Sequence, residues 1–305
     1  MRMIYMVLAH EGRPQVEALV ERLAPRGSLD RVIIHADRRS DLWRSLRDNP
    51  PGDPDHVELI EKPVACRWGH RSLISAIALL VDRAIELECD YAHLISGSDW
   101  PVASRQDILR ELESSQLPLC YIEAEYGREE DRMQGFRIDA RWLRPDPHRE
   151  RLAFKLKPQI VRLSRWLNGA RSRVLGDRSR PWGRWFKGET WWSLPGDALR
   201  VVAAELYGVT ASGRLRGTYV CEEHVVQTIV AAKFPDRLAG YRRYIDWVEG
   251  DDSPRVLGRG DQKAIAESGA WFARKFALGH DDFFLRLPIA QRFPAVAARA
   301  QSPAT

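Results

Sequence analysis

The sequence lacks the features of a membrane-spanning or exported protein. No stretch of its 305 residues reaches the roughly 18 consecutive apolar residues that indicate a transmembrane helix. The apolar run over residues 1–10 is too short for the core of a signal peptide followed by a cleavage site. We therefore expect neither a membrane span nor export, and we expect a cytoplasmic location.

Cysteine is scarce, and its spacing excludes two kinds of small-protein scaffold. Cys66, Cys89, Cys120 and Cys221 are far apart, and no CxxC pair occurs. Disulfide frameworks and zinc sites need closely spaced thiols, so neither is expected, and a reducing compartment fits best. The DxD sequence at residues 53–55 lies in a proline-rich loop, which we interpret as a rigid turn rather than a metal site.

Several common catalytic and nucleotide-binding motifs are also missing. GxGxxG, GxxxxGK[ST], HExxH and GxSxG do not occur, which argues against the usual dinucleotide, P-loop, zinc-protease and serine-hydrolase sites. A hydrophobic fraction of 44% with 29% charged residues is typical of a folded globular protein, so disorder is not expected. The chain length is compatible with one large domain, which we favour.

The first 125 residues alternate strand and helix patterns, as in a nucleotide-binding α/β sheet. Strands are predicted over residues 3–10, 31–37, 56–61, 91–102 with a turn at Gly97, and 118–125; helices are predicted over 14–24, 40–48 and 70–88. After an irregular region, a short strand over 188–195, a helix over 196–206 and a helix opening at Cys221 follow. These patterns predict the α/β class.

Polar residues gather where the predicted strands end. His10, His35, Asp37, Ser98 and Asp99 all occupy such positions. Ligands of open α/β sheets bind at the carboxyl ends of the strands, so these residues predict one pocket. Capping or turn roles are the alternative for each of them.

The positive charge is concentrated in the middle of the chain. The formal net charge is +5, and most of the excess lies between Arg128 and Arg184, where arginines are interleaved with Trp142, Trp166 and other tryptophans. Such a region can face RNA, a phosphorylated acceptor or an anionic membrane surface. A solvated basic helical face is the alternative, and a helix is predicted over residues 151–167.

Six short motifs occur in a characteristic order. They are HAD (35–37), RWGH (67–70), LISGSDWP (94–101), GETWW (188–192), CEEHVVQTI (221–229) and WFARKF (271–276). Together they resemble the core-2/I-branching β-1,6-N-acetylglucosaminyltransferase family, which also includes the peptide O-xylosyltransferases. The resemblance covers nearly the whole chain and is weakest over residues 127–184.

This resemblance implies a fold and a division of the chain. The implied fold is a single GT-A-like, Rossmann-like nucleotide-sugar-binding domain, with a mixed sheet flanked by helices. We expect a glycosyltransferase domain over residues 1–290 and a tail over 291–305. Within the domain we expect a nucleotide-sugar-binding half (1–125), a variable basic region (126–187), and a half with the catalytic base and the diphosphate site (188–290).

The resemblance also implies the chemistry. It predicts an inverting transfer of GlcNAc or xylose from a UDP-sugar to a hydroxyl of a glycan, a lipid-linked saccharide or a protein serine, with no metal and no cofactor. Fixed cations then meet the charge that develops on the leaving diphosphate. Lys275 matches the family's diphosphate-binding lysine, with Arg255 or Arg274 as its partner. Glu223 matches the general base, at a predicted helix start whose dipole favours the ionised form.

The other expected contacts with the donor lie near the amino-terminal strands. Asp37 matches a position that contacts uracil or ribose in the family, and Leu8 and His10 end the first strand facing the base. Trp68 either stacks on the base or packs beneath the long helix. His10 and His35 equally fit hydrogen-bonded strand-end histidines.

The expected contacts with the acceptor combine carboxylates and aromatic rings, which suit the hydroxyls and apolar faces of sugars. They are Asp99, Glu123, Glu125, Trp191 and Trp192. Because adjacent strand residues face opposite sides, we expect one of the two tryptophans to lie in the core.

Two rival functions remain open. The first is a UDP-sugar-binding protein without turnover, and the second is a nucleic-acid-binding protein that uses the Arg- and Trp-rich middle region. For the favoured function, the expected partners are the UDP-sugar donor and the hydroxyl acceptor, without nucleic acid. Peripheral contact with an anionic membrane, at its inner face, also stays open.

Overall fold

The computed structural model describes residues 1–135, 181–248 and 253–287, together with single helical residues between 159 and 174. Most of the helix expected over residues 151–167 lies outside the described residues, as do Trp142 and the expected tail. Among the residues that are described, no helix is both long enough and apolar enough to span a membrane.

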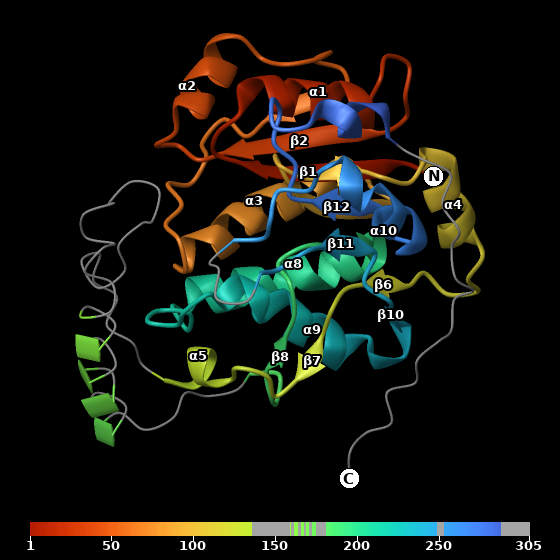
Figure 1. Ribbon diagram of the computed structural model, residues 1–305. Helices are drawn as coiled ribbons and strands as arrows, with labels where there is room; N and C mark the ends of the chain where they lie inside the picture. Colours follow the sequence, from red (N-terminus) through yellow and green to blue (C-terminus); the bar gives the residue numbers. More distant parts are fainter. Residues whose placement is uncertain are drawn as a thin grey trace.

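The described residues build a central seven-stranded sheet (Figure 1). Its order is β10 (Leu238–Ala239), β6 (Cys120–Tyr121), β9 (Trp192–Pro195), β4 (Tyr91–Ser96), β1 (Met3–Ala9), β2 (Arg31–Ala36) and β3 (Val57–Leu59). β4, β1, β2 and β3 are parallel neighbours, whereas β9 is antiparallel to both β4 and β6. The sheet is therefore mixed, and the predicted α/β class with a mixed sheet is confirmed.

Helices cover both faces of this sheet, as the alternating pattern of β1 requires. Met3, Tyr5 and Val7 pack with α1 (Arg13–Leu23), α2 (Asp41–Asp48) and α4 (Arg105–Glu113). Ile4, Met6 and Leu8 pack on the opposite face with α3 (Ser72–Glu86), α8 (Gly196–Ala211) and α9 (Val225–Lys233). Because successive strand residues point to opposite faces, a fully apolar strand is buried from both sides.

A three-stranded sheet attaches the carboxyl-terminal half to the first half. Its order is β11 (Arg243–Ile245), β12 (Phe272–Arg274) and β5 (Trp100–Pro101). β5 follows directly on the turn after β4, and β12 pairs antiparallel with it. Two flanking hydrogen bonds extend this pairing: Val102 N to Trp271 O (2.9 Å) and Phe276 N to Ser98 O (2.9 Å). The strand that ends beside Lys275 is thus held against the carboxyl end of β4.

Arg243 joins this small sheet to the central one. Its buried guanidinium donates to the carbonyl of Trp192 and to the hydroxyl of Ser193, both at 2.9 Å. The same hydroxyl lies 2.8 Å from Nδ1 of His93 on β4. Burial lowers the pKa of Arg243 to about 10 and that of His93 well below its usual value. A neutral His93 therefore shares the Ser193 hydroxyl with a buried cation.

The remaining elements lie around the site or close the carboxyl-terminal half. They are β7 (Glu125–Tyr126), β8 (Phe186–Lys187), α5 (Asp131–Gln134), α10 (Gln262–Glu267), and the 3₁₀ segments Cys221–Glu223, Pro235–Arg237, Arg259–Asp261 and Asp282–Arg286. β7 and β8 form a separate two-stranded antiparallel sheet.

Several predicted elements differ from the structure in their extent. The strand predicted over 118–125 splits into β6 and β7, and the one over 188–195 is reduced to β9. The helix predicted to end at residue 206 continues to Ala211. The turns at residues 53–55 and at Gly97 are confirmed.

The helix predicted to open at Cys221 is wrong in its first turn. Residues Cys221–Glu223 form a 3₁₀ segment, and α9 begins only at Val225. Val220 adopts a left-handed conformation with φ 50°, and His224 at φ −127° interrupts the helical geometry. Backbone geometry on both sides therefore separates Glu223 from the helix.

Glu111 connects α4 to the small sheet, so its loss should destabilise the fold. Its Oε1 accepts from Arg242 at 2.7 Å and 2.5 Å, and its Oε2 accepts from the Trp271 indole at 2.8 Å. Glu111→Ala leaves a nearly buried guanidinium unpaired, which should cost about 3 kcal/mol of unfolding free energy. Urea unfolding measures this cost.

The exposed neighbour Glu113 provides the matched control for that measurement. Glu113→Ala should change the free energy of unfolding by less than about 0.5 kcal/mol. Equal stabilities of the two variants would contradict the importance of the Glu111 contacts.

Candidate active site

The carboxyl edge of the central sheet brings together residues from distant parts of the chain. β1, β2 and β4 end side by side, since Ala9 pairs with Ala36 and Leu8 pairs with Ser96. β9 is antiparallel to β4, so the residues that precede Trp192 extend past this same edge. β6 ends there as well, and Glu123 follows it. The edge predicted to hold the ligand is therefore where the first and second halves of the chain meet.

The polar groups at the ends of β1 and β2 are partly occupied by local hydrogen bonds. The amide of Asp37 donates to Ala9 O at 2.9 Å, and its Oδ1 accepts from the Arg39 amide at 2.9 Å. Leu8 is buried in the sheet. The carboxylate of Asp37 thus shapes a turn at the position that we expected to contact the nucleoside.

The two histidines of this region have different environments. His35 Nε2 accepts from the Val64 amide at 2.9 Å, and burial lowers the pKa of His35 to about 4. His35 is thus the hydrogen-bonded strand-end histidine of our alternative. His10 is exposed, with Nε2 lying 3.5 Å from Glu11. Only His10 is therefore accessible at the rim.

Trp68 is not packed beneath α3. Its side chain is exposed, and its ring meets Tyr219 edge to face at a centroid distance of 5.7 Å. The core alternative for Trp68 is therefore wrong. Its ring lies at the surface, against Tyr219 of the loop before the 3₁₀ segment of Glu223.

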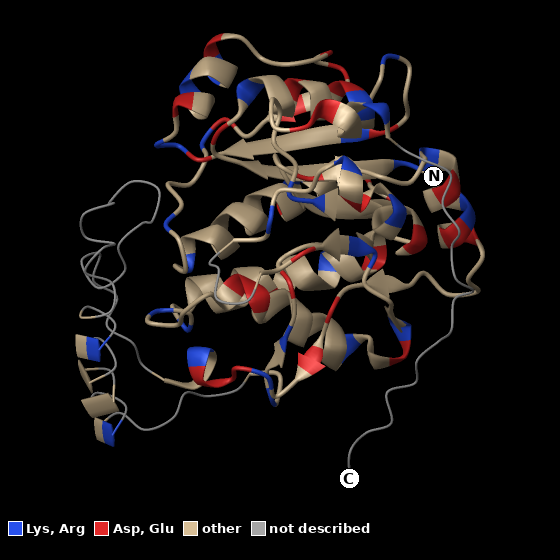
Figure 2. Ribbon diagram, in the orientation of Figure 1, with Lys and Arg blue, Asp and Glu red and all other residues tan. Residues whose placement is uncertain are grey.

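Glu223 lies among cations. Its Oε2 accepts from Arg132 Nη1 at 3.0 Å and lies 3.4 Å from Lys187 Nζ. Its side chain is 21% exposed. α9 begins two residues later, so Glu223 does not lie at the helix start that we expected, and the charges beside it belong to two side-chain cations. Figure 2 shows both signs of charge along α5, β7 and β8.

Gly188 allows the backbone segments of the site to approach closely. Its amide donates to Glu223 O at 2.9 Å, and the next amide, of Glu189, donates to the Glu123 carboxylate at 3.0 Å. A Cβ atom at position 188 would lie 1.9 Å from the carbonyl oxygen of Glu123. Only glycine at position 188 therefore permits the backbone segments of Glu123, Glu189 and Glu223 to lie this close together.

Glu189 is a site residue that the sequence analysis missed. Its Oε1 accepts from the Trp247 indole at 3.1 Å, and its carbonyl accepts from Gln227 at 2.7 Å. Burial raises the pKa of Glu189, and the charges of Glu223 and Glu123 act in the same direction. A buried carboxyl group with a shifted pKa in a cluster of charges is typical of functional sites. The available signal was the acidic residue of GETWW, which we considered only for its tryptophans.

Both tryptophans of GETWW are buried. We expected one of them to lie in the core, and the structure buries the other as well. Trp192 is inaccessible, and Trp191 is 8% exposed. The guanidinium of Arg274 lies 4.5 Å from the centroid of the Trp191 ring and occupies that face. The more exposed ring is that of Trp247, at 46%, which the sequence analysis did not single out.

Asp99 and Glu125 do not lie where the acceptor prediction needs them. Asp99 is buried, and it accepts from the amide and the hydroxyl of Ser96 at 2.9 Å and 2.5 Å. Asp99 therefore closes the turn after β4. Glu125 lies on exposed β7 and pairs with Arg128 at 2.9 Å. Of the three predicted acceptor carboxylates, the structure brings only Glu123 beside Glu223 and Glu189.

The cations predicted for the diphosphate differ in availability. Arg255 is bonded to both Asp246 and Asp261. Arg274 Nε lies 3.5 Å from Asp99, and its guanidinium stacks on Trp191. Lys275 is half-buried, and its ammonium group has no hydrogen bond or ion pair with any residue that the structure describes. Of the three predicted cations, Lys275 is thus the one whose charge no described residue pairs.

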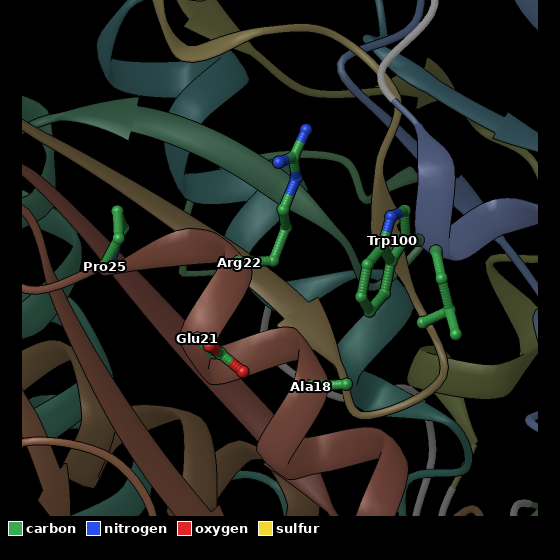
Figure 3. Close-up of a pocket in the computed structure, with 6 residues that line it drawn as sticks. Ala18, Glu21, Arg22, Pro25 and Trp100 are labelled. Carbon is green, nitrogen blue, oxygen red and sulfur yellow. The ribbon is translucent and has the colours of Figure 1, made fainter.

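A separate cavity of about 400 Å³ lies away from these residues (Figure 3). It is lined by Ala18, Glu21, Arg22, Pro25, Trp100 and Leu285. Its α1 residues belong to the carboxyl-terminal part of that helix, whereas the site lies toward the helix start. None of the predicted site residues lines this cavity.

The carboxyl edge of the sheet thus carries a cluster of carboxylates, Glu123, Glu189 and Glu223, and the strand β12 that precedes Lys275 pairs with β5 beside it. The family model described as Core-2/I-Branching enzyme matches residues 3–266. The chain belongs to the Core-2/I-Branching enzyme family, which is a family of glycosyltransferases.

Similarity to solved structures is weaker. A mannose-1-phosphate geranyltransferase from Thermus thermophilus is 14% identical, with a TM-score of 0.35, 78% of this chain covered and 73% of that chain. A 4-diphosphocytidyl-2C-methyl-D-erythritol synthase from Anaerococcus prevotii is 10% identical, with a TM-score of 0.32, 69% of this chain covered and 76% of that chain. No curated protein sequence matches the chain significantly. Likeness at this level does not bear on substrate or mechanism.

Replacing Gly188 should disrupt the packing of the segments that carry Glu123, Glu189 and Glu223. In Gly188→Ala the new methyl group would overlap the Glu123 carbonyl, so the segment must move, at a cost of about 3 kcal/mol. Thermal unfolding should show a lower Tm.

Gly208 in α8 has open space around its Cα and gives the matched control. Gly208→Ala should raise the stability by about 0.5–1 kcal/mol, because alanine is the better helix former. A Gly188→Ala variant as stable as the wild type would contradict the close approach of these segments.

Proposed function

We propose that this protein is an inverting, metal-independent glycosyltransferase that moves GlcNAc or xylose from a UDP-sugar to an acceptor hydroxyl. The proposal is supported by the family membership, which gives the class of reaction. The observation that carries it is Lys275, a half-buried cation without a partner among the described residues, on the strand held against the carboxyl edge of β4.

The proposed reaction is a single displacement. The acceptor hydroxyl oxygen attacks C1 of the sugar and loses its proton to the carboxylate of Glu223. The bond between C1 and the phosphate oxygen breaks, and its electron pair stays on the β-phosphate. Lys275 stabilises this developing charge, in the place where many related enzymes use a metal ion.

The arginines have supporting roles in this proposal. Arg274 holds its position between Asp99 and Trp191, next in the chain to Lys275. Arg255 is fixed by two carboxylates, and Leu257 close by donates to the Lys275 carbonyl at 2.7 Å. In this arrangement both arginines add positive potential, while Lys275 makes the direct contact with the diphosphate.

The proposal also covers the class of acceptor and the location of the protein in the cell. In this proposal Glu123 accepts a hydrogen bond from a hydroxyl of a glycan, a lipid-linked saccharide or a protein serine. A cytoplasmic enzyme that touches an anionic membrane through its basic middle region remains our expectation, and most of that region lies outside the described residues.

Donor turnover in the presence of EDTA tests the proposal. Purified protein is offered UDP-GlcNAc, UDP-xylose, UDP-glucose and UDP-galactose, and UDP release is followed together with thermal stabilisation by UDP. Release from one donor despite EDTA supports the metal-independent reaction and names the sugar. Stabilisation by UDP without release from any donor favours the binding protein without turnover. Activity that appears only with added manganese overturns the proposed mechanism.

Removing the Lys275 ammonium should weaken binding of the diphosphate. Lys275→Ala loses a charge-assisted contact, so its affinity for UDP should fall by roughly 10- to 100-fold. Isothermal titration measures this change. Lys263, with a side chain that is 85% exposed, is the matched control, and Lys263→Ala should bind UDP as the wild type does. Unchanged UDP affinity in Lys275→Ala would remove Lys275 from the site.

Replacing the proposed base should separate binding from turnover. Glu223→Gln keeps the shape of the side chain but cannot take the proton, so kcat should fall by roughly a hundredfold or more. Its affinity for UDP should stay close to that of the wild type. A variant that retains turnover would show that another group is the base.

A further inference from the structure

The chain leaves the small sheet at Lys275. β12 ends at Arg274, and residues 275–277 belong to no helix or strand. Their backbone groups therefore need hydrogen-bond partners other than a sheet ladder. The ring of Phe276 is buried and stacks on that of Phe284 at a centroid distance of 4.9 Å. This packing anchors one side chain, but it does not by itself fix the backbone on which Lys275 stands.

The side chain of Gln15 on α1 bonds to the backbone of this segment. Its Nε2 donates to the carbonyl of Phe276 at 3.0 Å, and its Oε1 accepts from the amide of Leu278 at 3.0 Å. A primary amide carries both donors and an acceptor, so one side chain bonds on both sides of Ala277. In a parallel sheet the backbone of a neighbouring strand makes bonds of this kind. The amide of Gln15 thus takes the place of a strand that is missing here.

The position of Gln15 in α1 has no other explanation in packing. Gln15 is 8% exposed and lies among the buried residues of the helix, which include Val16, Leu19 and Val20. A buried amide costs free energy unless it is hydrogen-bonded. Both of the hydrogen bonds described above go to the segment that follows Lys275. A polar side chain on this buried face is therefore explained by the segment that it holds.

Two backbone hydrogen bonds complete the support of the segment. The amide of Leu257 donates to the carbonyl of Lys275 at 2.7 Å, and the amide of Phe276 donates to the carbonyl of Ser98 at 2.9 Å. Partners from three different parts of the chain thus hold residues 275–278. Gln15 is the one among them that bonds through its side chain, so a substitution can remove its contribution alone.

We propose that Gln15 is a positioning residue for Lys275, whose amide fixes the backbone after the lysine so that the ammonium group meets the β-phosphate of the donor. This role rests on the proposed function, in which Lys275 binds the diphosphate. The stem of a lysine is flexible, so the place of its ammonium group depends on a fixed backbone. A binding group works best when its supporting contacts hold it to within about 0.5 Å.

The first test is the affinity of Gln15→Met for UDP. Methionine nearly keeps the length and volume of the side chain but makes neither hydrogen bond. The affinity should fall by roughly threefold to tenfold, because part of the binding free energy must then order the segment. Isothermal titration separates this effect from poor folding. Unfolded molecules lower the binding stoichiometry, whereas a displaced lysine raises Kd.

The decisive comparison uses the double variant Gln15→Met/Lys275→Ala. If Gln15 acts through Lys275, the double variant should bind UDP no more weakly than Lys275→Ala does. A purely structural role would lower the affinity in both backgrounds by the same factor. Leu19→Ala, one turn further along the buried face of α1, is the matched control. It should lower Tm and leave the affinity for UDP as in the wild type.

Hydrogen exchange of the wild-type protein tests the contact without any variant, so the proposal stays testable if Gln15→Met does not fold. The side chain of Leu278 is exposed, but its amide should exchange roughly a hundredfold more slowly than a free amide, because it is bonded to Gln15. Bound UDP should slow this exchange further, since the contact of the diphosphate with Lys275 stabilises the segment.

The outcomes separate this role from the function itself. Unchanged UDP affinity in Gln15→Met, equal losses in both backgrounds, or exchange of the Leu278 amide that UDP does not slow would each overturn the role of Gln15. Any of these results leaves the transferase intact, provided that Lys275→Ala weakens UDP binding. Wild-type protein that does not bind UDP would instead contradict the proposed function.

Discussion

The pairing of β5 with β12 is the constraint on which the rest of the site depends. It joins the turn that ends β4 to a strand far along the chain, and backbone bonds at Ser98 and Val102 extend it on both sides. Lys275 directly follows β12, so this pairing decides where the lysine lies relative to the carboxyl edge. The site is therefore made by joining two sheets, and neither sheet contains it alone.

Local patterns in the sequence predict most of the central sheet, whereas the joining contacts have no local signal. The apolar run of β1 and the apolar stripe of α3 are strong sequence signals, because the residues that form them are buried along one continuous element. β5 and β12 are only two and three residues long, and their stability comes from each other. The wrongly predicted helix start at Cys221 has a similar cause. The left-handed conformation of Val220 is stabilised by contacts distant in the sequence, such as the hydrogen bond from its amide to the carbonyl of Gly69.

The sequence singles out Glu223 and Lys275 only through the resemblance, and their roles stay predictions. The arrangement of the residues around them could not be predicted from the sequence. Asp99 and Trp191 are residue types that suit a sugar, but their positions next to Arg274 make them parts of its support. Glu189 could be recognised only after Gly188 had brought its segment against Glu123 and Glu223, since spacing in the chain carries no such information.

The buried guanidinium of Arg243 has a consequence for how the chain folds. It binds β9 of the central sheet from a strand of the small sheet, and its acceptors are neutral groups that would otherwise stay unsatisfied inside the protein. Separating the sheets would expose a cation on one side and strip hydrogen bonds from the other. The central sheet and the small sheet should accordingly open and close together, as one cooperative unit rather than as two independent folding units.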